Sequence, residues 1–245
     1  MGGARRVVPG AMAERLIVAL DLASIAEAEA MAERLDGVVS FFKLGLGLLF
    51  APGVDRLIAR LAGGGRRLFL DAKLYDIPET VGRAVTIAAA RGASLITVHG
   101  DRRIMAAAVA ARGDAPLQIF AVTVLTSLDD AALAEMGATV SAHELVRRRA
   151  RQALEAGCDG IIASAADHPD AIRSDIGGAI GGERLLIATP GIRPAGSGRD
   201  DHQRLATPRA AIARGADYLV VGRPIITAPD PRAAASAIIA EMNAA

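Results

Sequence analysis

The stretch Gly215-Ala216-Asp217-Tyr218-Leu219-Val220-Val221 passes from a glycine that ends a helical pattern into a short apolar run. Two earlier stretches, which begin Gly92-Ala93-Ser94 and Gly157-Cys158-Asp159, follow the same order. A glycine just after a helix closes its last turn, and a short run rich in Val, Ile and Leu is typical of a buried parallel strand. The chain is therefore predicted to repeat a unit in which a helix leads into a strand.

Short apolar runs alternate with longer Ala-rich helical patterns along almost the whole chain. Eight strands are predicted, at Leu16–Leu20, Val38–Phe42, Leu68–Leu70, Leu95–Val98, Ile119–Leu125, Gly160–Ala163, Leu185–Ala188 and Tyr218–Val221. Eight such units in 245 residues favour one α/β domain, a single (β/α)8 or TIM barrel. An open doubly wound sheet is the weaker alternative, because no G-x-G-x-x-G follows the first strand. Residues 16–245 are assigned to the barrel and residues 1–15 to an N-terminal extension, to which no role is assigned.

Charge and composition argue against several classes of function. The formal net charge is +1 and aromatic residues make up 3%, whereas nucleic-acid binders usually combine a basic stripe with aromatic platforms. The basic cluster from Arg147 to Arg151 falls in a helical pattern and is interpreted as a solvated face. No apolar run could span a bilayer, no signal peptide is recognisable, and Cys158 is the only cysteine. These features predict a cytoplasmic protein that binds neither nucleic acid polymers nor membranes.

Charged residues gather at the predicted carboxyl ends of the strands, where barrel enzymes place their active sites. Asp21, Lys43, Asp71 and Lys73 follow the first three strands, and Asp76 lies in the next loop. Residues two apart on an extended segment point to the same side, so Asp71 and Lys73 are expected to share the barrel interior. Buried charges are costly unless paired, and so many of them together indicate catalysis more than packing.

Glycine and arginine occur together after both the seventh and the eighth predicted strands. A barrel commonly binds phosphate between these two loops, through backbone N–H groups and charged side chains. We therefore predict a phosphate site at Gly191, Arg193, Gly222 and Arg223. The polar stretch Pro194–Arg204 beside it is expected to form a lid. No histidine pair has zinc-site spacing. His99 ends the fourth predicted strand and could face the site, but a core residue is favoured over a catalytic one.

Six segments together resemble the orotidine 5′-phosphate decarboxylase family. They occur in order along the chain and are Ala19–Asp21, Phe42–Gly45, Asp71–Thr80, Val122–Ser127, Thr189–Pro194 and Val221–Pro224. The resemblance implies a carboxy-lyase that converts orotidine 5′-monophosphate to UMP and CO2, the last step of pyrimidine synthesis, without a metal or organic cofactor. It also implies a homodimer whose active sites are shared between the subunits.

The resemblance further implies roles for individual residues. Lys73 would donate a proton to C6 of the pyrimidine, with Asp71 near the departing carboxylate, while Asp76 and Thr80 would reach into the partner's site. The catalytic residues implied in this way are Lys43, Asp71, Lys73 and Asp76. Those implied to bind the substrate are Asp21, Lys43, Asp71, Thr80, Thr126, Ser127, Pro190, Arg193, Gln203, Gly222 and Arg223.

Two other functions fit parts of the pattern. A related magnesium-dependent barrel acting on a sugar phosphate, such as a keto-acid sugar-phosphate decarboxylase or a hexulose-phosphate synthase, would also use D-x-K-x-x-D and a phosphate cradle. The strings Leu125–Ser127 and Gly191–Pro194 argue against it. A non-catalytic barrel that binds a phosphorylated ligand for regulation would be expected to have a broken Lys/Asp array, and here the array is complete.

Overall fold

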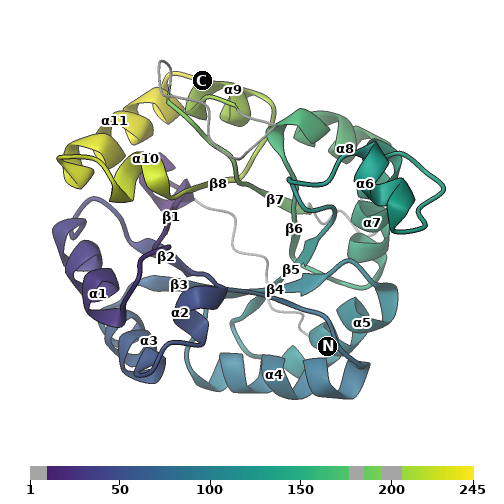
Figure 1. Cartoon of the computed structure of the whole chain (residues 1–245), viewed down its shortest axis with the longest axis horizontal. Coiled ribbons are helices and arrows are strands. Elements are labelled where there is room, and N and C mark those ends of the chain that lie inside the picture. The colour runs from purple at the N-terminus through teal and green to yellow at the C-terminus, as the bar shows by residue number, and fades with distance from the viewer. Residues whose placement is uncertain (1–9, 177–184, 195–205) are drawn as a thin grey trace.

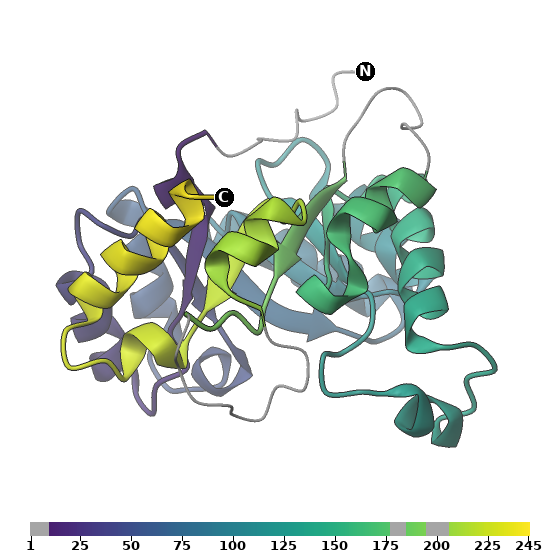
Figure 2. The ribbon, with the colours of Figure 1, turned by 90° about the horizontal axis from the view of Figure 1, so that it is seen from above.

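Eight parallel strands, each hydrogen-bonded to the next in chain order, close into a barrel because the eighth strand pairs with the first. The computed structural model describes residues 10–176, 185–194 and 206–245. Figure 1 looks into the ring of strands, with the helices arranged around its outside. Helix α11 (Pro231–Asn243) completes this outer ring beside α9 (Pro208–Ala213), as the turned view of Figure 2 shows. The predicted (β/α)8 barrel is confirmed.

The strands are short and the helices between them longer. The strands are β1 (Leu16–Ala19), β2 (Phe41–Leu44), β3 (Arg67–Leu74), β4 (Leu95–His99), β5 (Gln118–Val122), β6 (Gly160–Ile162), β7 (Leu186–Thr189) and β8 (Tyr218–Val221). The other helices are α1 (Ile25–Arg34), α2 (Leu46–Leu49), α3 (Val54–Gly63), α4 (Pro78–Ala90), α5 (Arg102–Arg112), α6 (Asp130–Glu135), α7 (Ala142–Glu155), α8 (Pro169–Asp175) and α10 (Arg223–Ile226), with 3-10 turns η1 (Met12–Arg15) and η2 (Ala165–Asp167). Over the described ranges, no helix has the length and apolar character needed to cross a membrane.

Two strand boundaries differ from the prediction in a way that matters for the site. β2 begins at Phe41 and not at Val38, because the N–H groups just before it bond back to the end of α1. β3 continues to Leu74, four residues beyond the predicted end at Leu70. Asp71 and Lys73 therefore belong to the sheet itself, which fixes their position more firmly than a loop would.

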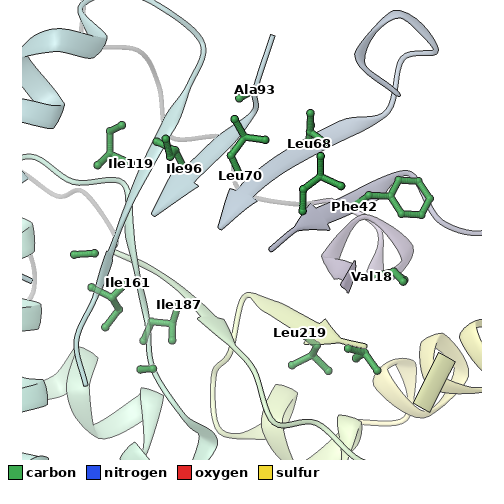
Figure 3. Close-up of a cluster of buried hydrophobic side chains, with 14 of the residues drawn as sticks. Val18, Phe42, Leu68, Leu70, Ala93, Ile96, Ile119, Ile161, Ile187 and Leu219 are labelled. Atoms are coloured by element: carbon green, nitrogen blue, oxygen red, sulfur yellow. The ribbon is translucent and has the colours of Figure 1, made fainter. Parts of the chain in front are cut away.

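Side chains alternate between the inside of the barrel and the layer under the helices, as the two-residue period of a strand requires. The inside is a packed core with a T-shaped contact between the rings of Phe41 and Tyr218, whose centroids lie 5.8 Å apart. Phe42 and Leu68 belong to the larger cluster between strands and helices, part of which is seen in Figure 3. Because the interior is filled, a ligand can only bind at an end of the barrel.

The polar residue in each repeated stretch of the sequence has the same structural role. Asp217 accepts a hydrogen bond from the N–H of Ile187, the second residue of β7, at 2.8 Å, and it also pairs with Arg173 of α8. Asp159 and Ser94 likewise accept from the second residues of β5 and β3. Each of the three side chains satisfies a backbone donor at the start of the preceding strand, and this explains why the three sequence stretches resemble one another.

Replacing Asp217 with alanine should lower the free energy of unfolding by about 3–5 kcal/mol. The side chain is 2% exposed, and its loss removes the acceptor of the Ile187 N–H and the carboxylate beside Arg173. Urea denaturation measures the change. The control is Asp55→Ala, which removes a surface carboxylate, 72% exposed and paired with Arg91, and should cost less than about 1 kcal/mol. Equal losses in the two variants would contradict the role of Asp217.

Candidate active site

Four charged side chains meet at the carboxyl ends of β1, β2 and β3. The ammonium nitrogen of Lys43 lies 3.2 Å from Asp21 Oδ1 and 3.2 Å from Asp71 Oδ2. The ammonium nitrogen of Lys73 lies 2.8 Å from Asp71 Oδ1. The signs alternate, so every charge in this ion-pair network (Asp21, Lys43, Asp71 and Lys73) has an opposite charge beside it. The structure thus brings together four of the residues that the sequence predicted at these strand ends.

Lys43 and Lys73 are the only two lysines of the chain, and the other residues counted as Lys or Arg are all arginine. An arginine side chain stays protonated under all ordinary conditions, whereas a lysine ammonium can release a proton when its surroundings favour it. Lys43 is 8% exposed, and the side chain of Lys73 is about one-third exposed. Both lysine side chains of the chain are therefore held in one site.

The carboxyl group of Asp71 is at the centre of the network. Its burial would by itself raise its pKa, but the ammonium groups of Lys43 and Lys73 and a hydrogen bond from Thr97 together hold the pKa below its ordinary value of 3.8. Asp71 is therefore ionised at neutral pH.

The backbone of β3 is irregular at the network. Lys73 has a φ of 45°, in the left-handed region that non-glycine residues seldom occupy. The pairing of β3 with β4 shifts register between Leu70 and Leu74, so that the three residues Asp71-Ala72-Lys73 lie opposite Thr97 alone. A bulge of this kind redirects side chains. Asp71 and Lys73 do meet, as predicted, but across a bulge and not along the regular strand that the prediction assumed.

A cavity of about 430 Å³ adjoins the network, which is within the range of small-molecule sites. Apolar side chains from the strands form part of its wall: Phe69, Val122, Ile162 and Val220. The four residues of the ion-pair network form another part of the wall, and the segments after β5, β7 and β8 add Thr126, Pro190, Gly191, Arg193, Gly222 and Arg223. An apolar surface bounded by charged groups suits a ligand that has a flat ring and an anionic substituent.

The predicted phosphate-binding residues line the same cavity as the lysines. Gly191 has a φ of 76°, which favours glycine at this position. Arg193 is 8% exposed and donates a hydrogen bond to the carbonyl of Ile192 at 2.9 Å, so its guanidinium is held in place. Two arginines therefore face the space that also holds two lysines. Gln203 lies outside the described residues.

Other predicted residues lie away from this cavity. Ser127 is not part of its lining, although its neighbour Thr126 is. Asp76 and Thr80 lie beyond the end of β3, and the Asp76 carboxylate accepts a hydrogen bond from the N–H of Ile77 at 2.6 Å. Asp76 lines a separate, smaller hollow. Within one chain, then, the second carboxylate of the network is Asp21 and not Asp76.

A model of the orotidine 5′-phosphate decarboxylase / HUMPS family matches residues 14–238, nearly the whole barrel. The chain belongs to this family. It is 50% identical over 228 residues to a protein of Caulobacter vibrioides (strain NA1000 / CB15N) named orotidine 5′-phosphate decarboxylase, covering 93% of this chain and 97% of the relative. It is 49% identical over 232 residues to a protein of the same name from Rhodopseudomonas palustris (strain TIE-1), covering 95% of each.

Two solved structures share the fold of this chain. The crystal structure of orotidine 5′-phosphate decarboxylase from Lactobacillus acidophilus has a TM-score of 0.80 at 34% identity, covering 94% of this chain and 99% of that one. An uncharacterized conserved protein from Geobacillus kaustophilus has a TM-score of 0.78 at 33% identity, covering 93% and 100%. The fold of this chain is therefore also that of a solved orotidine 5′-phosphate decarboxylase.

Gly45 is a site residue that the sequence analysis did not single out. A Cβ atom at this position would lie 2.8 Å from Asp21 Oδ1 and 3.4 Å from the ammonium nitrogen of Lys43. Any larger residue would therefore displace the Asp21 carboxylate from its place beside Lys43. The signal in the sequence was its spacing from Lys43, since Gly45 comes two residues later, directly after β2 ends.

The interpretation of the basic cluster in α7 as a solvated face is wrong for Arg149. Its guanidinium donates a hydrogen bond to the carbonyl of Thr123 just after β5, and its stem lies against Gly100.

His99 packs on Tyr75 with 4.9 Å between ring centroids, and burial together with the charges of Arg149 and Lys73 lowers the pKa of His99 below 6.5. Arg149 and His99 both support the loops around the site. Among the described residues, no three His, Cys, Asp or Glu side chains form a group that could hold a metal.

Stability should depend on pH through Asp71. Because its pKa is lower in the folded chain than the ordinary 3.8, its charge contributes stability that is present above the unfolded pKa and is lost as the pH falls through the folded one. In Asp71→Asn, the free energy of unfolding should therefore fall less steeply below about pH 4 than in the unchanged chain. Urea denaturation across a pH series tests this, with Asp55→Asn as the surface control. Parallel curves for Asp71→Asn and the unchanged chain would rule out this contribution.

Proposed function

We propose that this chain decarboxylates orotidine 5′-monophosphate to UMP and CO2, with Lys73 as the proton donor to C6. The observation that carries the proposal is the ion-pair network at one side of a cavity that Arg193 and Arg223 also line. The names of the relatives that match almost the whole chain support orotidine 5′-monophosphate as the substrate. No step of the proposed mechanism calls for a metal or an organic cofactor.

The lining of the cavity suggests how the substrate is bound. The phosphate is proposed to lie between the loops after β7 and β8, held by Gly191, Arg193, Gly222 and Arg223, with Gln203 as a further predicted ligand. Asp21 and Lys43 are proposed to contact the ribose hydroxyls. The pyrimidine then lies over the apolar wall, near Thr126, Ser127 and Pro190, with C6 toward Lys73. Binding of the distant phosphate can in this way orient the ring at the reacting end.

Decarboxylation breaks the bond between C6 and the carboxylate carbon, and the electron pair of that bond stays on C6. The ring cannot easily delocalise this pair, so the site must stabilise it by fixed charges arranged beforehand. The ammonium of Lys73 provides a positive charge next to C6, and one of its protons then forms the new C6–H bond. Lys73 is left as a neutral amine and regains a proton from water. Asp71 keeps Lys73 oriented, 2.8 Å away, and favours its reprotonation.

Lys73→Arg and Lys73→Ala should both lose turnover, by about 10²–10⁴-fold or more, because neither side chain can release a proton at the required place. UMP binding should change little, since the groups proposed to hold the phosphate are unchanged. The assay follows the loss of orotidine 5′-monophosphate absorbance, with and without EDTA. Near-normal turnover in Lys73→Arg would leave Lys73 only an electrostatic role.

The same assay separates the proposed function from its main alternative. Turnover of orotidine 5′-monophosphate that EDTA does not affect supports the proposal. Turnover of a sugar phosphate that EDTA abolishes, with none on orotidine 5′-monophosphate, would favour the magnesium-dependent sugar-phosphate activity. Specific binding of a phosphorylated ligand without turnover of either substrate would favour a regulatory barrel.

The active sites are proposed to be shared between the two subunits of a homodimer. Asp76 and Thr80 lie outside the cavity of their own chain, which supports a role in the partner's site. Beside Asp76, the large side chains of Tyr75 and Ile77 are 70% and 64% exposed in the single chain, as expected for a surface that a second subunit covers.

Mixing two inactive variants tests the shared site. Lys73→Ala and Asp76→Ala should each be inactive alone, but a heterodimer of the two has one site with both defects and one intact site. Random exchange after unfolding and refolding together should restore about one quarter of the activity per subunit, as expected for a two-fold dimer. A mixture without restored activity, in which heterodimers are detected by native mass spectrometry, would place Asp76 and Lys73 in the same subunit's site.

The domain limits and the location are retained as proposals. Residues 16–245 are proposed as the catalytic domain in the cytoplasm, with residues 1–15 as an extension. Within that extension, Arg15 donates hydrogen bonds to the carbonyls of Ala216 and Asp217, at 2.6 and 2.9 Å, just before β8 begins. The last residues of the extension therefore pack on the amino-terminal end of the barrel, away from the site.

A further inference from the structure

We infer that Thr97 is a positioning residue, which holds Asp71 and Lys73 in their working geometry; the inference rests on the proposed function for its kinetic consequence. Thr97 is fully buried in β4. Its hydroxyl accepts a hydrogen bond from the backbone N–H of Lys73 at 3.0 Å and donates one to Asp71 Oδ1 at 3.0 Å. One side chain thus links the backbone of the proposed proton donor to the carboxylate at the centre of the network.

The bulge in β3 gives this hydroxyl its role. Across the bulge, three residues of β3 lie opposite Thr97 alone, so regular backbone pairing with β4 is interrupted there. The N–H of Lys73 would otherwise be a buried donor that has left the ladder, and such a donor is costly without an acceptor. The hydroxyl of Thr97 supplies that acceptor, and it supports the left-handed conformation of Lys73.

The direction of the two hydrogen bonds is fixed. A backbone N–H can only donate and an ionised carboxylate can only accept, so the single hydroxyl proton of Thr97 must point to Asp71. Asp71 Oδ1 then accepts the hydrogen bond from the Thr97 hydroxyl and pairs with the Lys73 ammonium, while Oδ2 pairs with Lys43. Rotation of the carboxylate would break these contacts together. Lys73 is consequently tied to Asp71 twice, by its ammonium and through its backbone.

Thr97 does not line the cavity, so it acts on the substrate only through Asp71 and Lys73. Thr97→Val keeps the shape of the side chain and removes the hydroxyl, whereas Thr97→Ser keeps the hydroxyl. Ser94→Ala is a matched control, because Ser94 directly precedes β4 and its hydroxyl accepts from the Leu68 N–H of β3 at 3.1 Å, at the other end of the barrel. Ser94 has no contact with the network.

Steady-state kinetics on orotidine 5′-monophosphate should separate these variants. Thr97→Val should lower kcat by about 10- to 100-fold, the effect of losing a hydrogen bond to a charged group, with KM within about threefold. Thr97→Ser should recover most of the lost kcat. Ser94→Ala should keep the kcat of the unchanged chain even if it lowers the melting temperature. An unchanged kcat in Thr97→Val, or losses in Thr97→Val and Ser94→Ala that match, would overturn the inference.

A second measurement does not depend on turnover. Because the chain has only two lysines, protein labelled with ¹³C at lysine Cε gives two side-chain NMR signals, and Lys73→Arg assigns them. Thr97→Val should shift the Lys73 signal and its pH titration, and Ser94→Ala should leave both unchanged. If the unchanged chain failed to decarboxylate orotidine 5′-monophosphate, the proposed function would fail and the NMR result alone would decide the role of Thr97. An unaltered Lys73 signal in Thr97→Val would contradict that role.

Discussion

A buried carboxylate between two ammonium groups is the constraint around which the carboxyl end of this barrel is organised. Asp71 lies 3.2 Å from Lys43 and 2.8 Å from Lys73, with most of its surface removed from water. None of the three charges could be buried at low cost without the others, because an unpaired ion loses its hydration without a compensating partner. They come from two neighbouring strands, and Asp21 completes the series from a third. Parallel pairing of these three adjacent strands therefore brings the four charges together at one end of the barrel.

The two ends of the barrel use charge differently. At the amino-terminal end, Asp159 and Asp217 accept hydrogen bonds from backbone N–H groups and pair with arginines, so their charges are neutralised within the fold. At the carboxyl end, the acids pair with lysines beside a cavity, where the groups remain accessible to a ligand. This division is common in barrels of this fold, in which the residues that stabilise the fold and the residues that act on the substrate lie at opposite ends. Both lysines of the chain lie in the ion-pair network at the carboxyl end, whereas the two buried acids at the amino-terminal end pair with Arg112 and Arg173.

The architecture could be predicted from the sequence because it depends on signals that are local. Buried parallel strands such as β8 are short apolar runs, and the glycine that begins each repeated stretch marks the end of a helix. The residues at strand ends could be grouped for the same reason, since parallel strands bring their carboxyl ends together. The resemblance to a known family added the substrate and the role of each residue, which neither apolar pattern nor spacing contains.

What the sequence did not reveal depends on contacts between distant segments. Alternation along a strand assumes a regular pleat, so it could not show that β3 bulges at Lys73 or that Thr97 fills the gap. Helical periodicity placed Arg149 among exposed residues, because it does not tell which part of α7 faces the end of β5. The need for glycine at position 45 arises only once Asp21 has been brought beside it. In each case, the missing information is the identity of the neighbour across the fold.

The confinement of lysine to the site has a practical consequence for anyone who handles the protein. Reagents that acylate amines, such as the activated esters used for fluorescent labelling, cross-linking and surface attachment, find only the α-amino group and two side chains to react with. Lys43 is nearly enclosed, while Lys73 is partly open to solvent. Routine amine coupling would therefore attach the label either at the terminus or within the ion-pair network, and an attachment through an engineered thiol avoids both lysines.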